Sequence, residues 1–125
     1  MMTREKFIES TIGKPWVDRA DGPDSYDCWG LVVAYYREVL GREIPVYMGG
    51  DIASGYLDEI ESGRWKEGDG VVFMCFKNGV PAHCGLVFDN TVLHAAGWDG
   101  SGQVTMQPLR KLKRLFKDLK IYDHC

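Results

Sequence analysis

Three side chains in this sequence have the chemistry to transfer an acyl group together: Cys28, His83 and His94. A thiolate can attack a carbonyl carbon, and an imidazole can take the thiol proton and later protonate the leaving amine. We expect His83 to be that base and acid. His94 would hydrogen-bond the far nitrogen of His83 and so fix its tautomer and orientation. These residue types therefore predict a Cys-His-His triad.

The position of Cys28 favours a reactive thiol. The segment 27–40, DCWGLVVAYYREVL, predicts a helix that Asp27 caps and Gly41 ends. The free N–H groups and positive dipole end of a first helical turn stabilise a thiolate relative to a thiol. Cys28 is thus a candidate nucleophile, although the same position also suits a small buried structural cysteine.

A predicted antiparallel sheet carries the two histidines. Apolar runs alternate with two-residue turn signals between residues 70 and 95. Each histidine also has a structural alternative, as a hydrogen-bonded core residue or as a strand-end residue that faces water. We expect strands at 70–76, 82–88 and 91–95, joined by turns centred on Asn78-Gly79 and Asp89-Asn90.

These turns predict a register. Met74 is expected opposite His83, and Gly85 opposite His94, which puts both histidines on one face as diagonal neighbours. The small Gly85 leaves room there for an imidazole or a substrate. The other face is expected to be an apolar core made of Val71, Phe73, Cys75, Cys84, Leu86, Phe88 and Leu93.

Three more helices and one loop are expected around this sheet. Thr3 is the predicted cap of the first helix, and the Gly/Pro/Asp-rich loop is expected beside Cys28. The last helix would turn Leu112, Leu115 and Leu119 inward. The expected ranges are 3–12, 51–63 and 110–120 for the helices and 14–26 for the loop.

Length and composition indicate one domain, 1–125. A chain of 125 residues with 45% hydrophobic content can bury one core, and the sequence shows no repeat or low-complexity linker. The N-terminus lacks the apolar run of a signal peptide, and no stretch approaches the roughly 20 apolar residues of a membrane span. We therefore expect cytoplasmic synthesis and no membrane span.

The cysteines do not indicate a metal or a disulfide framework. Their spacing follows no disulfide or CxxC pattern, so we expect free thiols at Cys28, Cys75, Cys84 and Cys125. In the predicted register Cys84 points away from both catalytic histidines, so a zinc ion there would need Cys28 or an outside ligand. We expect no metal and no cofactor, and we expect His124 and Cys125 to be bystanders at a fraying chain end.

Charge is concentrated in one segment. Residues 110–120, RKLKRLFKDLK, hold six of the fifteen Lys and Arg residues and one acid, a net charge of +5 in a chain of total charge −3. A solvated helix face explains this pattern; a patch that binds an anionic polymer or an acidic protein partner is the functional alternative. Because the whole chain is acidic, nucleic acid is not expected as a partner.

Several motifs resemble one known family. Cys28 in DCWGLV, His83 in AHCGLVF and His94 in VLHAAG resemble the Cys-His-His signature of the NlpC-type cell-wall cysteine peptidases. The stretch 67–73, EGDGVVF, resembles the family's Gly-Asp strand, and the resemblance runs from about Ile12 to Ala96. It implies a papain-like α+β fold, with the cysteine at the N-terminus of a helix that packs on a central antiparallel sheet.

The resemblance also implies a function. The chain would be a thiol peptidase that cuts peptidoglycan stem peptides between D-glutamate and a diamino acid such as diaminopimelate. The tryptophan after Cys28 resembles the branch associated with bacteriophage tails and prophages, which implies phage tail proteins as partners and a location on a virion tail. Two alternatives stay open: a tail assembly component with a weak or inactive site, and an acyltransferase or amidase with the same triad.

One feature of the family is replaced here. Many members have a Pro-Tyr pair upstream of the cysteine, whose hydroxyl helps to form the oxyanion hole, whereas this chain has Pro15-Trp16. We expect Tyr26 to be the substitute donor, with the indole of Trp16 as second choice and Asp27 also bordering the substrate. The alternative for Tyr26 is that its ring only packs beneath the loop before it.

Overall fold

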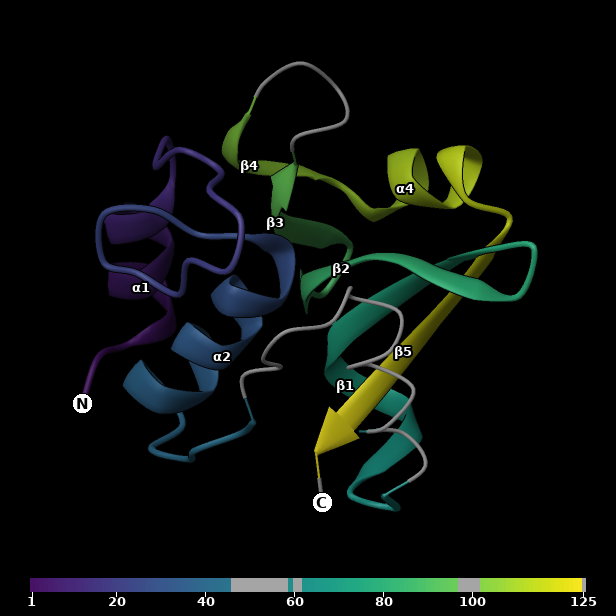
Figure 1. The fold of residues 1–125 in the computed structure, drawn as a ribbon, viewed down its shortest axis with the longest axis horizontal. Coiled ribbons are helices and arrows are strands. Elements are labelled where there is room, and N and C mark those ends of the chain that lie inside the picture. The colour runs from purple at the N-terminus through teal and green to yellow at the C-terminus, as the bar shows by residue number, and fades with distance from the viewer. Residues whose placement is uncertain (46–58, 60–61, 97–101, 125) are drawn as a thin grey trace. The chain divides into compact units, whose positions relative to one another are not determined.

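The computed structural model describes residues 1–45, 59, 62–96 and 102–124. Its fold is α+β, and the five strands form one sheet in the order β4-β3-β2-β1-β5 (Figure 1). β1 pairs antiparallel with both β2 and β5. In chain order the elements are α1 (Arg4–Thr11), α2 (Cys28–Glu38), β1 (Trp65–Lys77), β2 (Val80–Phe88), β3 (Thr91–Ala96), β4 (Gln103–Pro108), α4 (Leu109–Leu115) and β5 (Asp118–His124).

The chain divides into two compact units. The first comprises Met1–Val46 and Leu93–Met106, and it contains α1, α2 and most of β3 and β4. The second comprises Tyr47–Val92 and Gln107–Cys125, and it contains β1, β2, α4 and β5. The expectation of a single domain, 1–125, stays a prediction. In the part of the chain that is described, no helix is long and apolar enough to cross a membrane.

Local signals set the two N-terminal helices. The Thr3 hydroxyl accepts the backbone N–H three residues later at 3.1 Å, which caps α1. The Asp27 carboxylate caps α2 in the same way. Gly13 and Gly41 follow the two helices with φ of 87° and 65°, the left-handed conformation that commonly ends a helix. Both predicted helices are confirmed, with ends that differ by one or two residues.

The turn between β1 and β2 is also as predicted. Asn78 and Gly79 have φ of 54° and 77°, as a two-residue hairpin turn requires, and Lys77 pairs with Val80 across it. Asp89 has φ of 58°, which is typical of the second predicted turn. The strands of the three-stranded meander therefore lie where the apolar runs placed them, with β1 extended toward its N-terminus.

A β-bulge changes the register beyond the first turn. The pairing shifts between Cys75 and Phe76 because Ala82 is an extra residue on β2, and Cys75 lies opposite His83. The predicted pairing of Met74 with His83 is therefore wrong. A shift of one residue exchanges the two faces of a strand relative to its partner. The predicted composition of the two faces is accordingly wrong as well.

His83 shares its side of the sheet with the core of the second unit. Phe73 and Cys75, expected on the opposite face, belong to this buried cluster, and α4 contributes two leucines that cover it. Phe116, Leu119 and Ile121 pack against the cluster and are partly buried. The cluster consists of Phe73, Cys75, Val87, Val92, Leu109 and Leu112.

The basic C-terminal segment is not one helix. α4 ends at Leu115, Phe116 has extended backbone angles, and the chain then continues as β5. Leu119 reaches the core from this strand, in which it pairs with Cys75, and Leu115 is 52% exposed. The helix predicted over 110–120 is therefore wrong beyond Leu115, because pairing with β1 satisfies the backbone that a short isolated helix would hold only weakly.

β5 also holds the end of the chain. His124 pairs with Trp65 in the sheet, and their ring centroids are 4.8 Å apart in an edge-to-face arrangement. The expectation that His124 frays is therefore wrong. Cys125 lies outside the described residues, as do nearly all of the helix predicted at 51–63 and most of the turn at 97–102.

We expect Leu112→Ala to destabilise the protein strongly and Leu115→Ala to leave it almost unchanged. Leu112 is fully buried in the cluster, so truncation costs about 2–5 kcal/mol, whereas the exposed Leu115 on the same helix should cost within about 0.5 kcal/mol. Urea unfolding of both variants measures the difference. Equal destabilisation would contradict the packing of α4.

Candidate active site

Cys28 is the first residue of α2, in the first unit. Its thiol is not in a disulfide bond, and the residue is partly exposed. The position matches the prediction from the sequence: the thiol lies at the N-terminal end of the helix, where the positive end of the helix dipole favours the thiolate. A nucleophile at this position can be reached by a substrate while its backbone is fixed by the helix.

Asp27 organises the backbone around that thiol. Its carboxylate oxygens accept two backbone hydrogen bonds, one from the Gly30 N–H at 2.5 Å and one from the Arg19 N–H at 2.8 Å. Burial raises the pKa of Asp27 to about 6, the two hydrogen bonds oppose that rise, and the neighbouring Cys28 adds to it. One oxygen thus caps the helix and the other holds the preceding loop, so both have local backbone partners. The expectation that Asp27 borders the substrate stays a prediction.

Gly30 lets the preceding loop reach the first turn of α2. A Cβ at Gly30 would lie 1.9 Å from the carbonyl oxygen of Ala20, and that oxygen accepts the Asp27 N–H at 2.8 Å. The predicted loop beside Cys28 is therefore confirmed. Trp29, the other residue of this motif, is buried and donates its indole N–H to the Pro45 carbonyl at 2.9 Å.

Tyr26 lies with its ring against the loop. A Cβ at Gly22 would come within 2.7–2.9 Å of three atoms of the Tyr26 side chain, including the hydroxyl oxygen. Tyr26 also lines a cavity of about 410 Å³ together with Arg37 and Glu38. Those two residues are at the last turn of α2, about 14 Å along the axis from Cys28. This position favours the packing role of Tyr26 over the oxyanion role that we expected.

Trp16 has a fixed backbone and an accessible side chain. Its N–H donates to the Gly102 carbonyl at 2.6 Å, and its side chain is 40% exposed. The segment before it pairs with β4 through two backbone hydrogen bonds. The Gly13 N–H donates to the Val104 carbonyl at 2.9 Å, and the Val104 N–H donates to the Lys14 carbonyl at 2.8 Å. The indole N–H is therefore the remaining candidate for a second oxyanion donor.

His83 is on β2 in the second unit, and it is 3% exposed. Two aromatic rings flank its imidazole: Phe116 is stacked on it with centroids 6.4 Å apart, and Phe73 is tilted against it at 5.9 Å. Neither phenylalanine was among the predicted site residues. Phe116 was expected within a helix, and Phe73 on the opposite face, so no sequence pattern pointed to either of them.

His94 is on β3 in the first unit and is fully buried. Its strand is the one predicted from the sequence. Cys28 and His94 thus belong to one unit and His83 to the other. The assembly of the three side chains into one triad, and the pairing of Gly85 with His94, stay predictions.

The other described cysteines differ from Cys28 in burial. Cys75 and Cys84 are free thiols that are fully buried, and burial raises the pKa of Cys75 to about 12. Its thiol therefore stays protonated at neutral pH. Among the residues that the structure describes, no three His, Cys, Asp or Glu side chains are grouped to hold a metal ion.

We expect iodoacetamide to modify Cys28 much faster than any other cysteine near pH 7. Reactivity follows thiolate fraction and access, and Cys75 and Cys84 have no exposed surface. Mass spectrometry after brief labelling identifies the modified residue, with Cys28→Ala as the control that should lose the fast reaction. Earlier modification of Cys84 or Cys125 would contradict the assignment of the nucleophile.

Comparisons with solved structures show the fold. The NlpC/p60 domain of the peptidoglycan hydrolase SagA aligns with 92% of each chain at 18% identity and a TM-score of 0.63. NlpC2 from Trichomonas vaginalis aligns with 82% of this chain and 39% of its own, at 16% identity and a TM-score of 0.60. NlpC1 from Trichomonas vaginalis aligns with 84% of this chain and 37% of its own, at 20% identity and a TM-score of 0.56. The expected papain-like α+β fold is confirmed.

Sequence comparisons show the family. No curated protein sequence matches this chain. The model of the NlpC/P60 family matches residues 13–114, a range that contains Cys28, His83 and His94. The branch associated with phage tails stays a prediction. Because the matched range is most of the sequence, the chain belongs to the NlpC/P60 family.

Proposed function

We propose that this protein is a cysteine peptidase that hydrolyses the peptide stems of bacterial peptidoglycan. The observation that carries the proposal is a partly exposed cysteine, outside any disulfide, at the first residue of α2 in a chain of the NlpC/P60 family. Similarity of fold to a domain of a peptidoglycan hydrolase supports the substrate class. The bond proposed for cleavage joins D-glutamate to a diamino acid such as diaminopimelate.

The proposed reaction has two halves. His83 takes the proton of the Cys28 thiol, the sulfur attacks the scissile carbonyl carbon, and His83 then gives the proton to the leaving amine. Water next attacks the thioester, His83 takes the water proton, and the thiol is restored as the acid product leaves. His94 fixes the tautomer of His83 in both halves. The rings of Phe73 and Phe116 limit how the imidazole can rotate.

The oxyanion that forms in each half needs at least two donors. The backbone N–H of Cys28 is one, because an N–H in the first turn of a helix has no acceptor within the helix. The indole N–H of Trp16 is the proposed second donor, in the place of the family's tyrosine. Its backbone is held by the carbonyl of Gly102, the residue before β4, so the indole has a fixed point of attachment.

Incubation with purified peptidoglycan tests this function. The wild-type protein should release new amino groups, and the mass of the products should identify the bond cleaved. Cys28→Ala should abolish release and His83→Ala should remove nearly all of it, because they eliminate the nucleophile and the proton carrier. Circular dichroism of each variant checks that the fold is preserved.

His94 variants test the positioning role within the same assay. His94→Ala should lose less activity than His83→Ala, and His94→Asn should recover part of that loss, because an amide oxygen can still accept from the imidazole. Equal and complete loss in every folded His94 variant would contradict the role. If folded wild-type protein released no amino groups, the alternative of a tail assembly component would be favoured; transfer of the acyl group to an acceptor other than water would identify an acyltransferase.

We expect Trp16→Phe to lower turnover by about 10²–10³, the effect of losing one oxyanion donor. Tyr26→Phe is the matched control, because its hydroxyl lies beside Gly22 and should change turnover little. Alkylation of Cys28 by iodoacetamide forms no oxyanion, so its rate should stay the same in both variants. A large loss in Tyr26→Phe with full activity in Trp16→Phe would reverse the assignment.

A further inference from the structure

The exposed side of α4 and the turn after it form a concentrated cationic surface. Five side chains there are exposed, and none forms an ion pair with any residue that the structure describes. We call these five residues the α4 basic surface: Arg110, Lys111, Lys113, Arg114 and Lys117. Asp118, the next residue, is the only acid in the segment 109–120.

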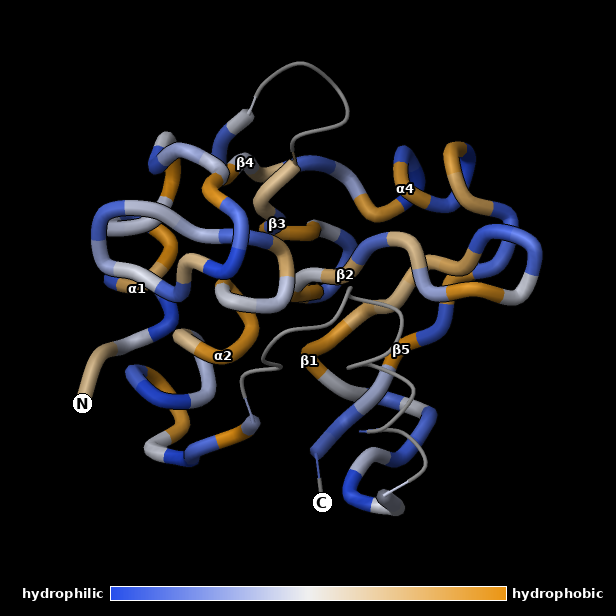
Figure 2. Tube along the Cα trace, viewed as in Figure 1, coloured by the Kyte–Doolittle hydropathy of each residue, from blue (hydrophilic) through white to orange (hydrophobic). Residues whose placement is uncertain are grey.

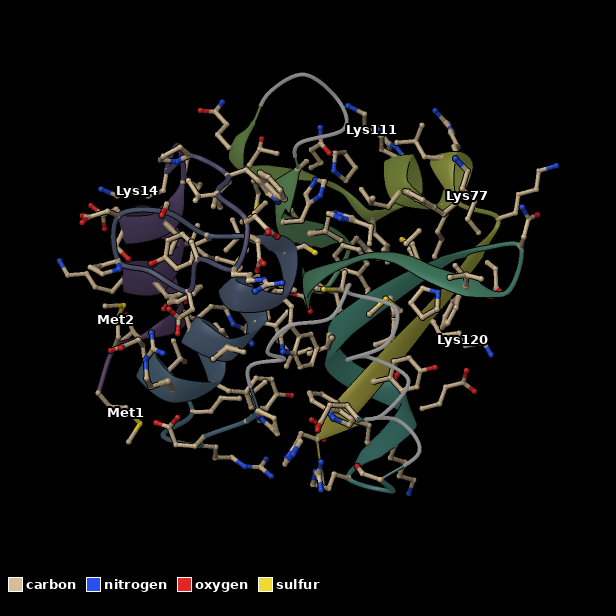
Figure 3. All side chains as sticks on the ribbon, in the orientation of Figure 1. Met1, Met2, Lys14, Lys77, Lys111 and Lys120 are labelled. Atoms are coloured by element: carbon tan, nitrogen blue, oxygen red, sulfur yellow. The ribbon has the colours of Figure 1, made fainter. Side chains whose placement is uncertain are left out.

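Lys120, in the same segment, differs from these five cations because it has partners within the protein. Lys120 on β5 lies 4.0 Å from a Glu67 carboxylate oxygen, and its ammonium group lies 5.4 Å from the centre of the Phe76 ring. Figure 3 shows Lys120 well apart from Lys111, which extends from α4. Lys120 thus has protein partners and is not part of the α4 basic surface.

Burial of two leucines fixes the orientation of these cations. Leu109 and Leu112 belong to the core of the second unit, so the opposite side of α4 has to face outward. Hydrophobic and hydrophilic residues alternate along α4 accordingly (Figure 2). Residues three and four apart on a helix are neighbours, with about 5–6 Å between their Cβ atoms. The four cations of α4 are therefore held close together on the outward side of an anchored element, and Lys117 follows in the turn after it.

The positive charge of this segment contrasts with the negative charge of the rest of the chain. Residues 110–120 carry a net charge of +5 although the total charge is −3, so the remaining residues are strongly acidic. Like charges at helical spacing repel each other and lower the stability of a helix. A group of repelling cations that has no acidic partner among the described residues is suited to a ligand that brings several negative charges at regular intervals.

We infer that the α4 basic surface binds an anionic polyol-phosphate polymer of the bacterial cell wall. This inference rests on the proposed function, because that function brings the protein to the wall. A flexible chain of phosphates can place one charge against each cation without a shaped groove. Binding would hold the enzyme near its substrate and release counterions from the polymer.

Nucleic acid and lipid fit the same surface less well. Single-stranded nucleic acid is usually bound through exposed aromatic rings, and the only aromatic residue of the segment, Phe116, packs against the core and the His83 ring. The acidic remainder of the chain also repels a long duplex. A membrane would need several exposed apolar side chains beside the cations, and Leu115 is the only one in α4.

The test measures binding of purified poly(glycerol phosphate) to protein that carries Cys28→Ala, so that hydrolysis plays no part. The binding constant should fall with salt at a slope of roughly −3 on logarithmic axes if the five cations are engaged. Arg110→Glu/Lys111→Glu should weaken binding at least about tenfold. Acidic residues in a first helical turn complement the helix dipole, so this variant should keep its fold.

Lys6→Glu/Lys66→Glu is the matched control, because both lysines are exposed and the change in net charge is the same. It should bind almost as tightly as the parent protein. Equal weakening in both double variants would overturn the inference, since net charge alone would then explain binding. Tighter binding to a single-stranded oligonucleotide of equal phosphate count, or to anionic lipid vesicles, would also overturn it. Absence of peptidoglycan hydrolysis by the wild-type protein, together with polymer binding, would contradict only the proposed function.

Discussion

The buried carboxylate of Asp27 is the interaction on which the arrangement around Cys28 depends. One of its oxygens accepts the Gly30 N–H and so begins α2, and the other accepts the Arg19 N–H and so holds the loop 14–26. Because both bonds come from one side chain, the start of the helix and the position of the loop cannot change independently. These two backbone contacts therefore set the position of the Cys28 thiol.

The rest of the motif serves the same local structure. Gly30 has no side chain because the Ala20 carbonyl occupies the space where a Cβ would lie, and Trp29 ties the chain after α2 through the Pro45 carbonyl. DCWG thus combines a cap, the proposed nucleophile, an anchor and a point of close approach in four successive residues. A short stretch can in this way specify the position of one thiol at the start of a helix whose next eight residues are all buried.

Local signals made part of this structure predictable. The caps at Thr3 and Asp27 and the turn at Asn78-Gly79 depend on neighbours within a few residues, and the structure confirmed them. The bulge at Ala82 was not predictable, because the turn alone does not show that an extra residue enters β2. β5 was missed because its pairing with β1 is set by residues more than forty positions away. The contacts of Phe73 and Phe116 with His83 could not be predicted either, because they depend on the bulge and on where β5 begins.

The aromatic surroundings of His83 have a consequence for where conformational entropy is lost. An imidazole that contacts the rings of both Phe73 and Phe116 has reduced freedom to turn about its side-chain torsions, so the entropic cost of orienting it is met when the protein folds. In the proposed mechanism, a substrate then does not have to restrict that ring again, and more of its own binding energy can act on the reacting groups. Two hydrophobic residues that touch no reacting atom would, in that mechanism, contribute to rate through preorganisation.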